Sequence, residues 1–300
     1  MYCLKPITIT SGMLTSSIAE IDTGEVAWVL GTTYAATDVR TYNTRKYERL
    51  VAGTDTVAPD LDANKWLDVG PTNKWAMFDT LRNTASTAPA TITVTIAPGQ
   101  RISALALMQC NASSATVTMT VGGSPVYGPI TFNMLKRSPT RWSEYFFGTF
   151  KPKPALVLFD LPLYSASTIT VVLTRSSGPV SIGAMCLGVP VYVGGTQYNA
   201  VSSALNFSTI ERNVFGDANL LQRRSVPKTD QITWIPKGNV NSLLDLRSEI
   251  NAVPCVWSGL DDRSDDDYFD SLLILGIYKE FSINLAFLEN AQVTLQLEEV

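Results

Sequence analysis

Residues 91–98 have the sequence TITVTIAP, in which threonine alternates with isoleucine and valine. Alternation of polar and apolar β-branched residues is typical of a strand that buries one face. Four further segments have a similar β-rich pattern: ISALALM at 102–108, ATVTMTV at 115–121, ALVLFDL at 155–161 and STITVVL at 167–173. Strands at this spacing predict an antiparallel, jelly-roll-like β-sandwich over residues 76–190.

Turn-forming residues separate these segments. Gly122-Gly123 predicts a tight hairpin turn, and Pro98-Gly99 and residues 176–179 (SSGP) predict two more, so neighbouring strands are expected to run antiparallel. Neither Gly122-Gly123 nor Gly194-Gly195 precedes a helical pattern. Neither pair therefore resembles a phosphate-binding loop.

The sequence before the sandwich has two parts. Residues 1–30 are expected to form an N-terminal docking segment with two short strands, ITIT at 7–10 and VAWVL at 26–30, around the turn residues Asp22-Thr23-Gly24. In residues 31–75 single aromatic side chains are separated by Asp, Asn, Gly and Pro. This pattern predicts a small β module that is held together by a few packed rings.

Residues 191–300 combine one helix with several strands. Residues 239–251 (NVNSLLDLRSEIN) have apolar side chains near one helical face, with Asn239 or Asn241 at the N-cap. Four segments predict strands of a sheet on which this helix packs: QITWI at 231–235, LLILGIY at 272–278, FSINLAF at 281–287 and QVTLQLE at 292–298. The predicted fold class is mainly β: a small aromatic module, an antiparallel sandwich and a C-terminal β-rich α+β domain with one main helix.

The composition excludes several classes of function. The chain has 300 residues, no histidine, and 23 basic against 27 acidic side chains. Without histidine there is no Ser-His-Asp or Cys-His relay and no histidine metal site. A net charge of -4 gives no positive field for nucleic acid. The four cysteines lack zinc or redox spacing, so we expect reduced thiols, no metal and no cofactor: Cys3, Cys110, Cys186 and Cys255.

The chain has no expected membrane span or secretion signal. Its N-terminus, MYCLKPITIT, lacks a cationic region followed by an apolar core. The longest apolar runs, such as residues 272–278, are far shorter than the ~20 residues of a spanning helix. We therefore expect a soluble protein.

Two charged clusters are candidate ligand sites. The acidic run at 261–267 (DDRSDDD) offers carboxylates suited to calcium, but an EF-hand loop would need Gly and Glu where Asp266 and Leu272 stand. Arg223, Arg224 and Lys228 are suited to contact phosphate or an acidic partner. Solvated surface is the favoured interpretation of both clusters.

The aromatic residues of 31–75 suggest sugar binding, because flat rings stack on the apolar faces of sugars. Their order resembles that of the small three-stranded chitin-binding modules of chitinases, with Thr37 where the family has Gly: Tyr34, Asp38-Val39, Tyr47, Pro59 and Trp66. The candidate stacking residues are Tyr47, Trp66 and Trp75. The alternative is that these rings form the core of the module.

Residues 68–79 (DVGPTNKWAMFD) resemble a segment of bacteriophage tail and baseplate proteins that joins such a module to a carbohydrate-binding-like sandwich. The C-terminal region resembles the same group at NVFGD (213–217), VPCVW (253–257), LGIYK (275–279) and FSI (281–283). The resemblance covers residues 28–300. It implies a structural tail-tip or baseplate protein of the virion, assembled in the host cytoplasm, that contacts other tail proteins in an oligomer or hetero-complex and contributes to binding of a host-surface glycan.

An alternative from another class is a carboxylate-dependent glycan depolymerase with non-catalytic binding modules. The four segments expected here are 1–30, 31–75, 76–190 and 191–300, and they leave no stretch of roughly 150 residues for a catalytic domain. No motif marks a pair among the 27 acidic residues. We therefore expect no enzymatic activity.

Overall fold

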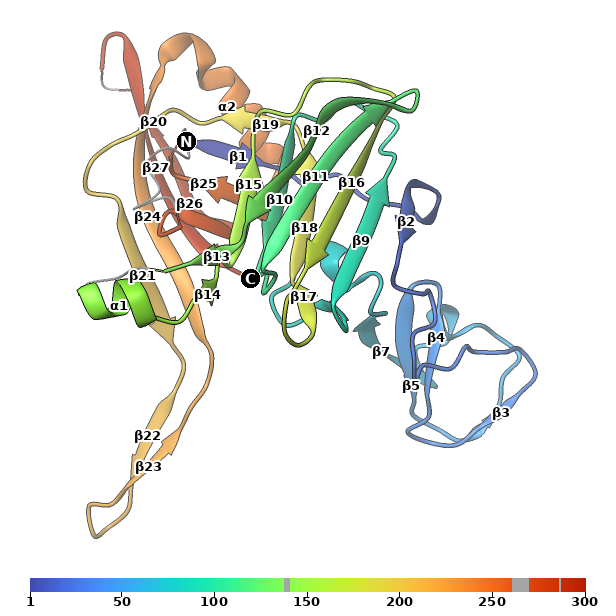
Figure 1. The fold of residues 1–300 in the computed structure, drawn as a ribbon. Helices are drawn as coiled ribbons and strands as arrows, with labels where there is room; N and C mark the ends of the chain where they lie inside the picture. Colours follow the sequence, from blue (N-terminus) through green and yellow to red (C-terminus); the bar gives the residue numbers. More distant parts are fainter. Residues whose placement is uncertain (138–140, 261–269, 286) are drawn as a thin grey trace. The chain divides into compact units, whose positions relative to one another are not determined.

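The computed structural model describes residues 1–137, 141–260, 270–285 and 287–300. Strands make up 49% of the chain and helices 10%, so the protein is mainly β, with antiparallel sheets and one main helix, as predicted. Two compact units are present: the central unit, Thr8–Met185, and the C-terminal unit, Met1–Ile7 with Cys186–Val300 (Figure 1). The four predicted segment boundaries stay predictions. The acidic run at 261–267 lies outside the described residues.

The larger sheet of the central unit confirms the alternating pattern. Its inward residues Ile92, Val94 and Ile96 are buried, while outward threonines bond across strands, for example Thr95 to Thr170 at 3.1 Å. Every paired strand runs antiparallel. The strand order is β12-β11-β16-β9-β2: β12 Ser124–Asn133, β11 Ser114–Val121, β16 Ser167–Thr174, β9 Thr91–Ile96 and β2 Leu14–Ser16.

A smaller sheet stacks on the inward face of the larger one (Figure 1). Its central strand, β10, and one edge strand, β18, are buried along their whole length. A strand that is covered on both faces has no solvent-facing positions for polar residues. The sequences of β10 and β18 are therefore almost entirely apolar. The order is β15-β10-β18: β15 Ala155–Leu158, β10 Ala104–Met108 and β18 Ala184–Gly188.

One of the three predicted hairpins is present. Gly122-Gly123 joins β11 to β12, which pair directly. Pro98-Gly99 instead leads from β9 in the larger sheet to β10 in the smaller one. Residues 176–179 lead from β16 to β17 (Val180–Ile182), which pairs with β8 (Ser86–Ala88). The last two predictions were wrong because a turn residue permits a reversal but the buried faces of the strands decide which sheet each strand joins.

The small aromatic module has a three-stranded sheet, β4-β5-β7, and a separate pair, β3 with β6. The predicted strands at 7–10 and 26–30 are absent from the structure. Val26 and Trp28 form backbone hydrogen bonds with Thr41, but this pairing stays an isolated bridge at Ala27 and does not extend into a strand. Besides β2, the elements of residues 11–78 are η1 Ser11–Met13, β3 Thr33–Tyr34, β4 Val39–Tyr42, β5 Arg45–Arg49, β6 Gly53–Thr54, η2 Pro59–Leu61, β7 Trp66–Pro71 and η3 Ala76–Phe78.

The C-terminal unit is built on one antiparallel sheet of order β19-β1-β25-β26-β27-β24-β20, with β21 also paired to β24. The N-terminal strand β1 lies between β19 and β25. The strands are β1 Tyr2–Leu4, β19 Pro190–Tyr192, β20 Gly195–Thr196, β21 Val201–Asn206, β24 Ser225–Pro236, β25 Cys255–Ser258, β26 Leu273–Asn284 and β27 Asn290–Glu299.

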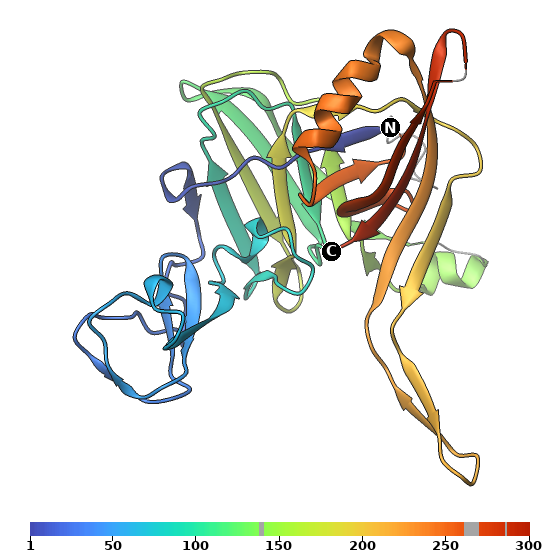
Figure 2. The same ribbon diagram turned by 180° about the vertical axis from the view of Figure 1, so that it is seen from behind.

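Helix α2 (Val240–Glu249) is the predicted helix, and it packs on this sheet (Figure 2). Asn239 holds the N-cap position without a side-chain hydrogen bond to the helix, and η4 (Lys237–Asn239) precedes it. Leu243 and Leu246 share one buried cluster with residues of β27 such as Val293 and Leu295. The apolar face of the helix and the inward face of β27 therefore form the core of this unit.

Strand β26 joins two segments that the sequence predicts as separate strands, 272–278 and 281–287. The pairing with β27 skips one residue, since Tyr278 pairs with Leu297 and Glu280 with Gln296. Lys279 is thus the extra residue of a β-bulge, which shifts the alternation by one position without ending the strand. The prediction of two strands was wrong for this reason.

Gly276 is expected to tolerate no side chain. A Cβ atom there would overlap the carbonyl oxygen of Glu298 on the paired strand β27. Gly276→Ala should therefore lower the free energy of unfolding of the C-terminal unit by about 1–3 kcal/mol, the usual cost of overpacking, as measured by urea denaturation. Gly238→Ala, which meets no atom within 4 Å, is the matched control. Equal stability of the two variants would contradict the predicted close approach.

Candidate functional site

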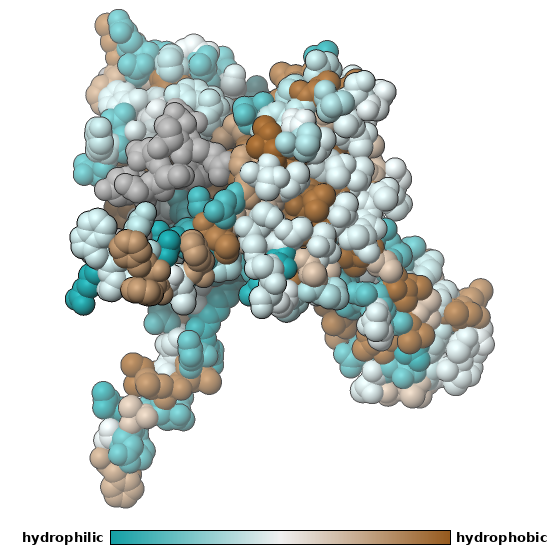
Figure 3. All heavy atoms as spheres, in the orientation of Figure 1, coloured by the Kyte–Doolittle hydropathy of each residue, from teal (hydrophilic) through white to brown (hydrophobic). Residues whose placement is uncertain are grey.

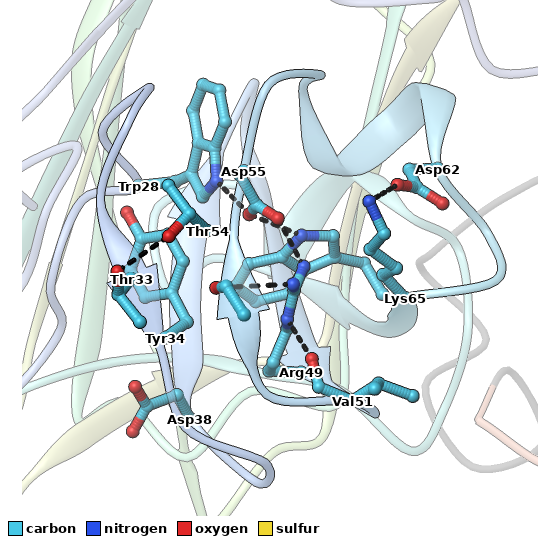
Figure 4. Close-up of polar contacts among 12 residues, drawn as sticks. Trp28, Thr33, Tyr34, Asp38, Arg49, Val51, Thr54, Asp55, Asp62 and Lys65 are labelled. Atoms are coloured by element: carbon cyan, nitrogen blue, oxygen red, sulfur yellow. Dashed lines mark hydrogen bonds and ion pairs between the residues drawn. The ribbon is translucent and has the colours of Figure 1, made fainter.

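A buried ion pair lies at the centre of the small module (Figure 4). The side chains of Arg49 and Asp55 are each 1% exposed, and Arg49 Nη1 lies 2.5 Å from Asp55 Oδ1. Arg49 also donates from Nε to the carbonyl oxygen of Val51 and from Nη2 to that of Gly53. A buried charge is tolerated only when its donors and acceptors are satisfied, and most of the Arg49 donors have a partner here.

Two tryptophans complete the shell around Asp55. The indole N–H groups of Trp28 and Trp66 each donate to Asp55 Oδ2 at 2.9 Å. Burial alone would raise the pKa of Asp55, but the hydrogen bonds from Trp28, Trp66 and Arg49 outweigh burial and hold the pKa below its usual value. The carboxylate is therefore ionised at neutral pH and connects the segment around β6 to β5 and β7.

Two of the predicted sugar-stacking residues lie in this interior. Tyr47 is 6% exposed and Trp66 is 2% exposed, and they form one cluster with Tyr34. Tyr34 contacts Trp66 edge to face at 5.3 Å, and the guanidinium of Arg49 lies 5.1 Å from the Trp66 ring centroid. These are the contacts of a packed core, as in the alternative interpretation. Sugar stacking by these rings stays a prediction.

The third predicted residue, Trp75, lies outside that cluster and is 8% exposed. Its indole N–H donates to Glu20 at 2.9 Å, and Lys74 forms an ion pair with the other oxygen of the same carboxylate. Phe78 contacts the ring edge to face at 5.9 Å. Both residues of the Lys74-Trp75 dipeptide therefore bind a residue that precedes the module.

Asn73 has a similar structural role in the GPTNKW segment. Its side-chain amide donates to Asp22 and to the carbonyl oxygen of Thr87, and its oxygen accepts from the amide of Thr87. The Asn73 side chain thus makes the two backbone hydrogen bonds with Thr87 that a neighbouring strand would otherwise make. In the central unit the GPTNKW segment thus joins residues 20–22, before the module, to residue 87, after it.

The module is expected to lose stability in acid. The depressed pKa of Asp55 means that ionised Asp55 contributes stability above the unfolded-state pKa of about 4, and that this contribution is lost as the pH falls through the lower folded-state value. Tryptophan fluorescence should therefore be constant from about pH 7 to 5 and change below about pH 4. Asp55→Asn should lack this acid transition. A transition of equal size in both proteins would contradict the assignment to Asp55.

The C-terminal unit carries a long hairpin, which we call the arm (residues 207–224). Its strands are β22 (Thr209–Arg212) and β23 (Ala218–Leu221), and every residue of both is exposed. Ile210 and Leu220 are paired and face one side, at 64% and 69% exposure. Leu221 pairs with Thr209 and faces the other side. The arm, drawn as the hairpin of β22 and β23 in Figure 1, therefore has apolar side chains on both faces according to the pairing and exposure of its residues.

The tip of the arm is a turn organised by one side chain. The oxygen of the Asn213 amide accepts from the backbone amides of Phe215 and Asp217, and its nitrogen donates to the Asp217 carboxylate. Gly216 has a φ of 89°, which favours glycine. This turn holds Val214 and Phe215 outward, at 94% and 88% exposure.

Sequence reasoning missed the apolar surface of the arm, and it missed a second exposed surface at residues 141–153. The arm contains NVFGD, quoted above only for its resemblance, and Arg223 and Arg224, which are exposed. The second surface had a visible signal, because residues 142–150 (WSEYFFGTF) contain five aromatic residues. The sequence of either segment does not indicate whether its apolar side chains are buried or exposed.

Cys3, Cys110, Cys186 and Cys255 are buried free thiols. Burial raises the pKa of Cys110 and of Cys186 to about 12, so both stay protonated at neutral pH. Within the described residues, no group of three or more acidic, cysteine or histidine side chains is placed to hold a metal ion. In the same part of the chain, no helix is both long enough and apolar enough to cross a membrane.

No protein-family model matches the chain, and no curated protein sequence matches it.

Proposed function

We propose that this protein is a non-enzymatic structural component of a bacteriophage tail tip or baseplate, assembled into the virion in the host cytoplasm. Its role in this proposal is to dock neighbouring tail proteins. The observation that carries the proposal is the arm, whose apolar side chains are exposed on both faces and at the tip.

The exposure of the arm favours a partner protein. An isolated two-stranded hairpin is at best marginally stable in water, and monomeric proteins rarely expose clustered apolar side chains. Phe207, Ile210 and Leu220 are between 53% and 69% exposed. A neighbouring protein that covered both faces would bury this apolar surface. Each Å² of apolar surface buried would contribute about 25 cal/mol of favourable binding free energy.

The resemblance to phage tail proteins supports the same role. One of the segments that carries it, NVFGD at 213–217, is the tip of the arm. Asn213 and Gly216 shape this turn, and Val214 and Phe215 project from it. The residues that shape and occupy the proposed contact are thus among those quoted for the resemblance.

A contribution to host-surface glycan binding belongs to this proposal. The predicted stacking residues Tyr47, Trp66 and Trp75 are all buried. Aromatic side chains that are exposed outside the module are more accessible to a sugar polymer than these three buried rings.

Electron cryo-microscopy of purified particles tests the docking role. We expect density for this chain in the tail, with Val214 and Phe215 covered by a neighbouring protein. A chain that is missing from particles, or an arm that contacts only solvent in every copy, would contradict the proposal. New reducing ends after incubation with host polysaccharide would instead favour the depolymerase.

A further inference from the structure

A second exposed surface lies in the central unit, in a lobe of residues 135–137 and 141–153. Strands β13 (Leu135–Lys136) and β14 (Lys151–Pro152) pair antiparallel and carry helix α1 (Trp142–Phe147) between them. The hydrophobic surface over α1 is visible in Figure 3. Five aromatic rings are more than half exposed: Trp142, Tyr145, Phe146, Phe147 and Phe150, with Trp142 at 80% and Phe147 at 87%.

These rings are held by one another and by one cation. Trp142 and Phe146 lie nearly parallel, with an interplanar angle of 21° and centroids 6.4 Å apart. The guanidinium of Arg137 lies 5.6 Å from the centroid of Tyr145 and 4.4 Å from that of Phe150. Cation–π contacts of this kind fix the position of rings that have little other packing. The rings thus form one contiguous aromatic surface on α1 and the segment that follows it.

The lobe is basic within an acidic chain. Its charged residues are Lys136, Arg137, Arg141, Lys151 and Lys153 against the single acidic Glu144, whereas the whole chain has 23 basic and 27 acidic residues. Lys136 and Lys151 are direct cross-strand partners. Like charges in that arrangement raise the local positive potential and attract an anion. Charge complementarity therefore favours a negatively charged partner.

The kind of apolar side chain favours a sugar polymer over a protein. All the strongly exposed apolar residues of the lobe are aromatic, while the arm exposes aliphatic residues such as Ile210 and Leu220. Rigid rings stack on the flat apolar faces of sugars at a small cost in side-chain entropy, whereas protein interfaces also use aliphatic packing.

We propose that this lobe binds acidic polysaccharide, with Trp142, Phe146 and Phe147 stacking on sugar rings and Arg141 and Lys151 binding carboxylate, sulfate or phosphate groups. Bidentate pairing of arginine with such anions adds specificity to the stacking. This inference deepens the glycan part of the proposed function, on which it rests, by naming the site and the ligand class. It is independent of whether the arm docks in a tail.

The test is affinity electrophoresis of the purified full chain in gels that contain polygalacturonate, dextran sulfate, teichoic acid or neutral dextran. We expect retardation by at least one acidic polymer and little by neutral dextran. Trp142→Ala/Phe147→Ala should weaken binding about tenfold or more, since exposed rings contribute to binding but not to folding. Tyr198→Ala, which removes a ring that is 98% exposed outside the lobe, should bind like the parent.

A second pair of variants isolates the charges. Arg141→Gln/Lys151→Gln should weaken binding. It should also make binding less dependent on salt between about 50 and 300 mM, because fewer charge–charge contacts with the polymer remain for salt to screen. Arg101→Gln/Lys237→Gln removes the same charge elsewhere and should retain the parent's salt dependence. Equal binding by the lobe variants and the parent would overturn the proposal.

Three other results would also overturn it. The first is no retardation by any of the acidic polymers. The second is equal retardation by neutral dextran. The third is binding of anionic phosphatidylglycerol vesicles, polyglutamate or oligothymidine in place of the polysaccharides. Incorporation into particles is measured separately, so a failure of the tail role and a failure of glycan binding give different results.

Discussion

Asp55→Ala is expected to unfold the small aromatic module and to leave the C-terminal unit folded. The change leaves the buried Arg49 without its counter-ion and the indole N–H groups of Trp28 and Trp66 without their acceptor. Removing one partner of a buried ion pair costs about 3–5 kcal/mol. The module has only a small aromatic core, so this loss should exceed its stability. Hydrogen exchange should rise in peptides from 31–75 and stay unchanged in peptides from 225–300.

Asp62→Ala is the matched control for this prediction. Asp62 pairs with Lys65 at 3.1 Å, and the side chains of Lys65 and Asp62 are 41% and 17% exposed, against 1% for both members of the buried pair. A surface pair of this kind contributes about 0–1 kcal/mol, so exchange in the module should barely change. Arg49→Met/Asp55→Leu should regain part of the loss, because both charges are removed together. Parent-like exchange in Asp55→Ala would show that the pair does not hold the module together.

Val214→Ser/Phe215→Ser is expected to reduce incorporation of the chain into phage particles about tenfold or more, as for the loss of a central interface contact. Both side chains are almost fully exposed, so the fold of the isolated chain should be unchanged. The measurement is quantitative mass spectrometry of purified particles after complementation with the variant. Light scattering of the purified chain should also show less self-association, since an exposed apolar tip is removed.

Tyr198→Ser is the control for the arm, because it removes an exposed ring from the same unit outside residues 207–224. Its incorporation should equal that of the parent. If the tip variant also reached parent levels, the arm would not be the docking element, and the proposal would lose the observation that carries it.

Strands β9, β11 and β16 of the larger sheet could be predicted from the sequence because each of them buries one face. In β9 the apolar residues Ile92, Val94 and Ile96 are buried, and the threonines between them face outward. The sequence shows this as a strict alternation of threonine with isoleucine or valine. Strand partners could not be predicted in the same way. The pairing of β9 with β16 depends on contacts between residues about 75 positions apart, as between Thr95 and Thr170.

The polar centre of the module could not be predicted, because a charged residue gives no sign of being buried. Arg49 and Asp55 stand among many exposed charged residues, and only the fold brings them within 2.5 Å of each other. The aromatic pattern did identify the residues that surround them, such as Tyr34 and Trp66. It could not show that the indole N–H of Trp66 is directed at a carboxylate.

The position of β1 has a consequence for synthesis of the protein on the ribosome. Cys3 pairs with Val191 on one side and Trp257 on the other, so β1 is enclosed by two strands that are synthesised after the whole central unit. At roughly 5–20 residues per second, β1 waits for tens of seconds before its second partner emerges. The central unit, Thr8–Met185, is complete well before then. Translation order therefore favours folding of the central unit first, with closure of the C-terminal sheet as a late step.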